Sequence, residues 1–186
     1  MAVDEPRASE GTGVRIRDLR RDARELSACD FEERHGSGFL LRSAAENERP
    51  TDPTATQVAL LTDLEASPTP GESASLCLLA YPLVRSARSV APLVSIGRTP
   101  NNDVVIPHLS VSRFHAFLKT HDAGRFLLQD AGSVNGSAVN GNAVPRQGSG
   151  PPVDLKAGDN VRLGRVQLSF LDADALREFV RAHDPH

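Results

Sequence analysis

The sequence lacks the features of a disulfide-bonded or membrane-spanning protein. Its two cysteines, Cys29 and Cys77, lie far apart and form no Cys-x-x-Cys pair. A disulfide framework or a zinc site is therefore not predicted, and a reducing compartment is the simplest expectation. The longest apolar run, residues 76–81, is far shorter than a membrane span, and the polar N-terminus has no apolar core for a signal peptide. We expect a soluble, cytoplasmic protein.

Tryptophan is absent, aromatic residues make up only 4% of the chain, and lysine occurs only at Lys119 and Lys156. The formal net charge is −3 and the sequence pI is about 6.1. Such a chain does not attract nucleic acid or an anionic membrane surface, so neither is expected as a partner. The other basic residues are arginines, whose forked guanidinium groups suit phosphate and carboxylate ligands.

We interpret residues 1–70 as a partly helical N-terminal extension of unknown role. Apolar residues recur there at helical spacing, and Asp30 and Gly36 are a candidate N-cap and stop for a second, short helix. The elements expected are a helix over about 16–28, a helix over 31–35, a strand within 38–44, a short helix within 51–66 and a Pro/Gly-containing linker at 67–73.

The sequence pattern changes at about residue 75, where short apolar runs broken by Gly, Asn and Asp begin. This pattern predicts an all-β antiparallel sandwich over residues 75–171. The predicted strands lie within 75–84, 91–98, 102–106, 113–120, 124–131, 137–140, 143–145, 152–155, 160–164 and 166–171.

Two local signals complete the predicted fold. Asn140–Gly141 suits a two-residue type I′ hairpin turn. Residues 172–186 are expected to form a C-terminal helix and tail, in which Asp172 caps the helix. Its apolar stripe, Leu176, Phe179 and Val180, should dock on the sandwich.

The serine and histidine of "LSVSRFHAFL" do not predict a catalytic site. If a strand begins near Ser112, residues three apart point to opposite faces, so Ser112 and His115 would not meet as nucleophile and base. The spacing of His108, His115 and His121 matches no recurrent zinc site, and no glycine precedes a lysine as a P-loop requires. We therefore expect no enzyme, no metal and no cofactor.

The same region carries the chemistry of a phosphate site. Arg98 follows Gly97 at a predicted strand end, Ser112 and Arg113 lie in a second loop, and "GSVNG" supplies Ser133 and Asn135 in a third. Loops from one end of a sandwich converge. A phosphate dianion needs forked cations with hydroxyl or amide donors and no catalytic base.

These residues resemble the forkhead-associated (FHA) family, a phosphothreonine-binding β-sandwich, in its bacterial form with an N-terminal extension. The resemblance spans about residues 75–171. Its motif elements occur here in the family's order: Gly97–Arg98, Ser112–Arg113–Phe114–His115, Ser133–Val134–Asn135–Gly136, Asn140–Gly141, Gly158–Asp159 and Gly164. The family reads phosphorylated motifs with arginine.

The resemblance implies a role for each matching residue. Arg98 and Ser112 would hold the phosphate, Arg113 would support the phosphate or the peptide backbone, and Asn135 would hydrogen-bond the peptide main chain. Val134 stands where many members carry a hydroxyl that helps to hold the phosphate, so only its backbone could contribute. The architectural positions would be Gly97, His115, Gly136, Asn140 and Gly141.

Two functions from different classes follow. The resemblance implies a phosphothreonine-peptide-binding adaptor or regulator in Ser/Thr kinase signalling, whose partner is a phosphothreonine-containing protein such as a kinase or its substrate. The alternative is a phosphate-independent interaction or assembly module that uses another surface of the same fold. Intact Arg98, Ser112 and Asn135 favour the first, whereas Val134 and the Asn-Gly-Ser at Ser137, where Asn-Gly-Thr is usual, are departures that could retune binding.

Overall fold

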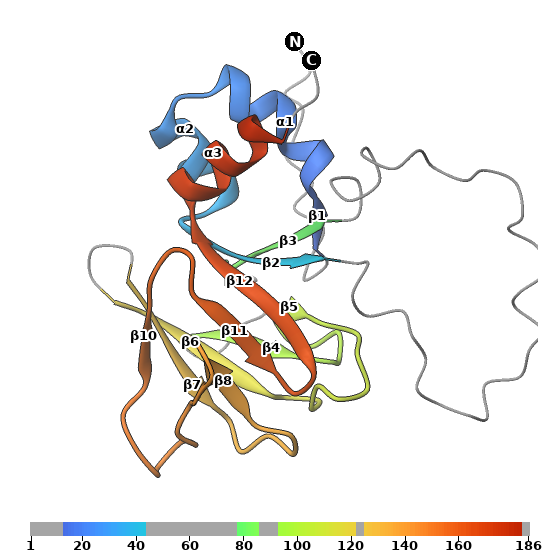
Figure 1. The fold of residues 1–186 in the computed structure, drawn as a ribbon, viewed down its shortest axis with the longest axis vertical. Helices are drawn as coiled ribbons and strands as arrows, with labels where there is room; N and C mark the ends of the chain where they lie inside the picture. The colour runs from blue at the N-terminus through green and yellow to red at the C-terminus, as the bar shows by residue number, and fades with distance from the viewer. Residues whose placement is uncertain (1–12, 44–77, 86–92, 122–124, 184–186) are drawn as a thin grey trace, which may run out of the picture.

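The computed structural model describes residues 13–43, 78–85, 93–121 and 125–183, and its framework is a pair of packed β-sheets (Figure 1). In the described residues one sheet has seven strands, in the order β1 (Val14–Arg15), β3 (Leu78–Pro82), β2 (Gly38–Ser43), β12 (Val166–Asp172), β11 (Asn160–Leu163), β8 (Ser137–Val139) and β9 (Asn142–Ala143). The other has five, in the order β10 (Val153–Leu155), β7 (Arg125–Asp130), β6 (Ala116–His121), β4 (Val94–Gly97) and β5 (Val104–Val105). The predicted all-β sandwich is confirmed, and each of the ten predicted runs overlaps a strand, although the run at 143–145 shares only Ala143 with β9.

One pair of strands departs from the expected antiparallel pattern. β5 runs parallel to β4, with Ile96 opposite Val104. The reason is that Asp103, just before β5, accepts hydrogen bonds from the backbone N–H and the hydroxyl of Ser95 at 2.8 and 2.7 Å. These bonds return the connecting loop to the start of β4, so β5 begins beside it and runs in the same direction.

The sandwich core lies between the inner faces of the two sheets. Along β12, Val166, Leu168 and Phe170 are buried and alternate with more exposed residues, as the period of two requires. Phe126 of β7 meets Phe170 edge to face, with 5.6 Å between the ring centroids. This contact joins the two sheets through the core.

Strand β2 comes from the predicted N-terminal extension but lies inside the seven-stranded sheet, paired with β12 and β3. Leu40 faces the sandwich core, whereas its neighbours Phe39 and Leu41 belong to a second cluster on the other face. The strand predicted within 38–44 is confirmed. The domain limits 1–70, 75–171 and 172–186 stay a prediction, although the strand pairing ties the first of these stretches to the second.

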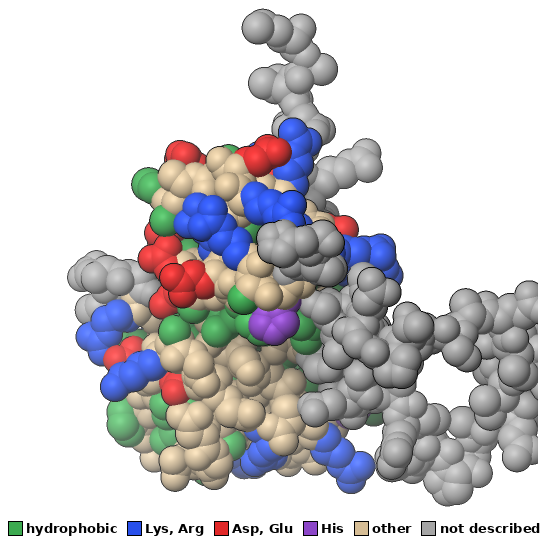
Figure 2. All heavy atoms as spheres, turned by 45° about the horizontal axis from the view of Figure 1, so that its top comes forward, with side chains coloured by type: hydrophobic (Ala, Val, Ile, Leu, Met, Phe, Trp, Pro, Cys, Tyr) green, Lys and Arg blue, Asp and Glu red, His purple; other side chains and the backbone are tan. Residues whose placement is uncertain are grey.

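Three helices cover the outer face of β2 and β3 (Figure 1). They are α1 (Ile16–Glu25), α2 (Ala28–His35) and α3 (Ala173–Ala182). The second apolar cluster lies between these helices and the sheet and includes Ile16, Leu19, Phe31, Phe39, Leu41, Leu176 and Val180. These three helices therefore form a third layer with its own core, and charged side chains of both signs lie over the surface of this end of the molecule (Figure 2).

The two helices predicted over about 16–28 and 31–35 are present, with corrections at their ends. α1 ends at Glu25 instead of about 28, and α2 begins at Ala28. The predicted cap Asp30 is wrong, because the hydroxyl of Ser27 accepts the N–H of Asp30 at 3.2 Å and so caps the helix three residues earlier. Gly36, with φ of 99°, ends α2 as predicted.

The C-terminal helix matches the prediction closely. The carboxylate of Asp172 caps α3 by accepting the N–H of Ala175 at 2.8 Å. Leu176 and Val180 are buried against α1, α2 and the sheet, while Phe179 is half-buried and stacks on His183. The stripe therefore docks within the protein.

The Asn-Gly hairpin is also confirmed. Asn140 and Gly141 have φ of 50° and 83°, the left-handed values that a type I′ turn requires at both positions, and they join β8 to β9. The helix predicted within 51–66, the linker at 67–73 and Cys77 lie outside the described residues. None of the described helices is both long and apolar enough to cross a membrane.

Candidate functional site

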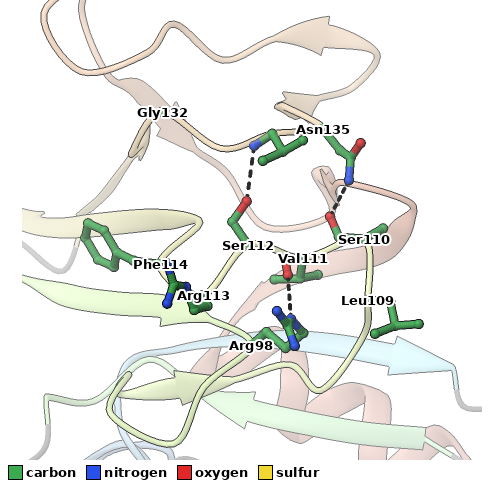
Figure 3. A pocket seen from close by; sticks show the side chains of 10 residues that line it. Arg98, Leu109, Ser110, Val111, Ser112, Arg113, Phe114, Gly132 and Asn135 are labelled. Carbon is green, nitrogen blue, oxygen red and sulfur yellow. Dashed lines mark hydrogen bonds between the residues drawn. The ribbon is translucent and has the colours of Figure 1, made fainter.

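An open depression of about 510 Å³ lies where the loop after β4, the loop before β6 and the β7–β8 loop meet (Figure 3). Its lining consists of Arg98, Leu109, Ser110, Val111, Ser112, Arg113, Phe114, Gly132, Val134 and Asn135. All five residues that the sequence proposed for ligand binding are therefore brought together: Arg98, Ser112, Arg113, Val134 and Asn135. Ser133, proposed with the third loop, is buried and does not line the depression.

Arg98 is held from one side only. Its backbone N–H donates to the carbonyl of Ser112 at 3.0 Å, and its side-chain Nε donates to the carbonyl of Val111 at 3.2 Å. Within the described part of the chain, no further hydrogen bond or ion pair is recorded for its guanidinium. Both terminal nitrogens are thus available to a ligand, while the Nε bond fixes the direction of the side chain (Figure 3).

Gly97 permits this arrangement because there is no room for a side chain beside it. A Cβ at this position would collide with the carbonyl oxygen of Arg113 and lie 2.7 Å from Nδ2 of Asn102. The architectural role proposed for Gly97 is consistent with this close approach.

Asn102 is a residue that sequence reasoning missed. Its buried amide donates to the carbonyls of Thr99 and Arg113 at 2.8 and 2.7 Å, which ties the Arg98 loop to the Ser112 loop. The only available signal was an asparagine in a turn-rich stretch, "TPNND", which is too common to predict a bridge between loops.

Ser112 presents a free hydroxyl proton to the depression. Its Oγ accepts the backbone N–H of Val134 at 3.1 Å, so its own O–H remains as a donor. This bond also links the second loop to the third and holds Val134 N–H at the site, although the Val134 side chain is 84% exposed. Arg113 is exposed next to it, and no side-chain partner is recorded for it among the described residues.

His115 makes hydrogen bonds to two of the loops that surround the depression. β6 begins at Ala116, so Ser112 and His115 both lie in the preceding loop, and the expectation of opposite strand faces is wrong. The backbone N–H of Ser112 donates to Nδ1 of the fully buried His115 at 3.0 Å, and Nε2 lies 3.2 Å from the carbonyl of Gly136. Nδ1 is therefore the acceptor, and Nε2 carries the proton.

This histidine cannot act as a base toward Ser112, because its accepting nitrogen is occupied by a backbone N–H. Burial lowers the pKa of His115, outweighing the hydrogen bond to Gly136 and the charge of Asp130, which raise it. The imidazole is thus held neutral in one tautomer. The expectation that Ser112 and His115 form no catalytic pair agrees with these contacts.

Asp130 is the centre of a buried polar network beneath the third loop. Its carboxylate accepts the hydroxyls of Ser133 and Ser137 at 2.7 and 2.6 Å and the backbone N–H groups of Gly132 and Ser133 at 2.8 Å each. Burial raises the pKa of Asp130, but these four hydrogen bonds together lower it below its usual value. The charged carboxylate therefore shapes the loop that carries Val134 and Asn135.

Asn135 reaches across to the second loop. Its Nδ2 donates to the carbonyl of Ser110 at 2.8 Å, which leaves one amide hydrogen and the side-chain oxygen directed away from that bond (Figure 3). Gly164 lies so close to the same carbonyl that a Cβ at this position would collide with Ser110. Gly136 accepts the N–H of Gly164 at 3.0 Å, so the late glycine of the motif buttresses the loops.

The remaining motif residues lie at the neighbouring hairpin. Asn140 donates to the carboxylate of Asp159 at 2.7 Å and accepts the N–H of Asn160 at 2.9 Å. These bonds join the β8–β9 turn to β11 and place no group in the depression. Among the described residues, no group of three His, Cys, Asp or Glu side chains could hold a metal ion.

Comparisons with known proteins agree on one family. The family model for the FHA domain matches residues 94–164. The oxoglutarate dehydrogenase inhibitor of Corynebacterium diphtheriae is 36% identical over 81 residues, covering 44% of this chain and 52% of that protein. The glycogen accumulation regulator GarA of Mycolicibacterium smegmatis is 37% identical over 83 residues, covering 43% of this chain and 46% of that protein.

The chain thus spans about half the length of these curated relatives. Among solved structures, the FhaA FHA domain complexed with the intracellular domain of Rv3910 is 29% identical, covering 46% of this chain and 87% of that chain, with a TM-score of 0.37.

Proposed function

This chain carries an FHA domain, and on that premise we propose that it binds phosphothreonine-containing proteins as an adaptor or regulator in Ser/Thr kinase signalling. The observation that carries the proposal is the lining of the depression, which contains two arginines and a free serine hydroxyl but no Asp or Glu. Such a site attracts a dianion and offers it directed donors without a base for chemistry.

Arg98 and Ser112 are the proposed phosphate ligands. The terminal nitrogens of Arg98 donate charge-assisted hydrogen bonds, each worth about 1.5–3 kcal/mol. The Ser112 hydroxyl donates a further bond, since Val134 N–H already occupies its acceptor side. Arg113, exposed on the adjacent position, adds positive charge toward the phosphate or the peptide backbone.

Asn135 is proposed to meet the peptide main chain. The hydrogen bond to Ser110 holds the Asn135 amide in place before any ligand arrives, which lowers the ordering cost of binding. Because backbone groups are common to all peptides, this contact supplies affinity without sequence preference.

The relatives support a regulatory role instead of a catalytic one. One is named as an enzyme inhibitor and the other as a regulator of glycogen accumulation. We propose that this protein likewise acts by binding, with a phosphorylated protein as its target.

The test is a selection from a degenerate phosphothreonine peptide library, followed by calorimetric titration of the best peptide. We expect a Kd near micromolar, equivalent to about −8 kcal/mol, for the phosphothreonine form. The unphosphorylated peptide should not bind measurably, and the phosphoserine form should bind more weakly. Equal affinity for the phosphorylated and plain peptides would favour the phosphate-independent interaction module.

A further inference from the structure

Exposed apolar side chains gather at the rim of the depression. Four large apolar residues are exposed in the described parts of the chain, and three of them line the site: Leu109 at 85%, Val134 at 84% and Phe114 at 46%. The fourth, Val84, lies outside the lining. Single exposed apolar residues are ordinary, but their concentration around one polar pocket marks a surface that a partner covers.

The loop that carries Leu109 holds this side chain in water. His108 N–H donates to the carbonyl of Ile106 at 2.8 Å, and Val111 N–H donates to the carbonyl of His108 at 2.9 Å. Ser110 N–H donates to Nδ1 of His108 at 3.1 Å. With the backbone bonded on both sides of Leu109, the loop cannot fold the leucine inward without breaking these bonds.

The ring of Phe114 is fixed as well. It stacks on the buried ring of Phe117, with the centroids 6.3 Å apart and the planes 6° from parallel. A ring that is already positioned loses little conformational freedom when a ligand covers its free face. Figure 3 shows Arg98 and Ser112 between Phe114 on one side and Leu109 on the other.

We propose that the phosphopeptide bound here carries an apolar side chain on each side of its phosphothreonine, one contacting Leu109 and the other Phe114. This inference rests on the proposed function and names the class of sequence that the site selects. In an extended peptide, three residues span about 10 Å, so the residues that flank the phosphothreonine reach about 10 Å from it in each direction. The positive, acid-free lining between the two apolar residues complements a phosphate between two apolar side chains.

The experiment measures affinity for a set of phosphothreonine peptides in a neutral polar background. Leucine replaces glutamine at one position at a time, from three residues before to three residues after the phosphothreonine. Removing about 50 Å² of apolar surface from water corresponds to about an eightfold gain in affinity. We expect a gain of about three- to tenfold at one position on each side.

Variants of the full chain assign each gain to its contact. Leu109→Ser should abolish the gain on one side, and Phe114→Ser should abolish it on the other, while Phe114→Leu should retain part of it. Val84→Ser is the matched exposed apolar control and should leave both gains intact. Each variant should keep the melting temperature of the wild type and its preference for phosphorylated over plain peptide.

Three results would overturn the inference and leave the proposed function standing. They are equal affinity for all the phosphopeptides, gains that persist in both serine variants, and a dimer of the free protein that Leu109→Ser dissociates. The last result would assign the rim to a second copy of this chain. Loss of phosphate dependence in the wild type would instead overturn the proposed function, and the inference with it.

Discussion

The polar groups on the rim of the depression and those in the network beneath it differ in how fully their hydrogen bonds are satisfied. Around Asp130, the neighbouring hydroxyl and N–H donors each have an acceptor, and the carboxylate is saturated. On the rim, the side chains of Arg98 and Ser112 each make one hydrogen bond and keep further donors unused. Satisfied buried groups hold a shape, whereas partly satisfied groups near the surface keep donors that a ligand can use.

The two ends of β12 also differ, because one end contacts the depression and the other contacts the helical layer. Gly164 and Arg165, before the strand, contact the Ser110 loop of the depression. Asp172, at its other end, caps α3 of the helical layer. Seven strand residues correspond to about 23 Å, so changes in the helical layer should affect stability without reaching the site.

The largest effect is expected from Asp130→Ala. This change leaves the hydroxyls of Ser133 and Ser137 and two N–H groups without their acceptor in a buried place. The free energy of unfolding should fall by about 3–5 kcal/mol, as measured by urea denaturation. Asp154→Ala, which removes an exposed carboxylate paired with Arg125, is the matched control and should change stability little. A stable Asp130→Ala protein would mean that the network does not hold the loop.

Leu176→Ala should cause the next largest loss of stability. Leu176 is fully buried between α3 and the other helices, and truncation of such a leucine costs about 2–5 kcal/mol. Thermal unfolding should show the loss, and calorimetry should show unchanged phosphopeptide affinity. Phe179→Ala should cost less, because its ring is only half-buried. A change in affinity with Leu176→Ala would couple the helical layer to the site and remove the contrast between the two ends of β12.

Arg98→Ala should reverse this pattern, with affinity lost and stability kept. Losing charge-assisted bonds worth about 1.5–3 kcal/mol weakens phosphopeptide binding by about ten- to a hundredfold. Arg98→Lys should recover only part of the affinity, because a point charge cannot reproduce a bidentate fork. Titration calorimetry beside thermal melts would separate the two readouts. Unchanged affinity of Arg98→Ala would exclude this arginine as the phosphate ligand.

The sequence predicted the sandwich and the convergence of the ligand residues because both leave strong local patterns. Alternating apolar runs and Asn140–Gly141 follow from strand periodicity and turn geometry. The choice of Arg98, Ser112 and Asn135 as ligand residues rested on the resemblance of their motifs to those of the FHA family. These residues now line one depression, and their role as phosphopeptide ligands remains a proposal.

Features that depend on distant contacts could not be predicted. β5 is parallel to β4 because Asp103 binds Ser95, and nothing local to β5 indicates this partner. Asn102 bridges two loops that only the fold brings together. The alternation argument for Ser112 and His115 failed because β6 starts later than its apolar pattern suggests, with the loop held instead by His115 itself.

The last prediction concerns pH and is the smallest in size. Burial lowers the pKa of His115 in the folded protein, so between that value and about 6.5 the unfolded chain takes up a proton that the folded chain does not. Stability should therefore fall as the pH drops from about 7 through this window, by at most about 1.4 kcal/mol per pH unit from this residue. His108, whose pKa is lowered by burial and by Arg42 and Arg165, adds a change of the same sign.

Urea denaturation of the wild type and His115→Gln between pH 5 and 8 isolates the His115 contribution as a difference in slope. The variant should be less stable at pH 7, because Gln cannot reproduce the ring contacts, but its stability should vary less with pH.

Peptide affinity is also expected to fall toward pH 5, because the phosphate regains its second proton near pH 6. That loss belongs to the ligand, so it should persist in His115→Gln. If the variant instead abolished the pH dependence of binding, His115 would act on the phosphate, and its assignment to the fold alone would be wrong.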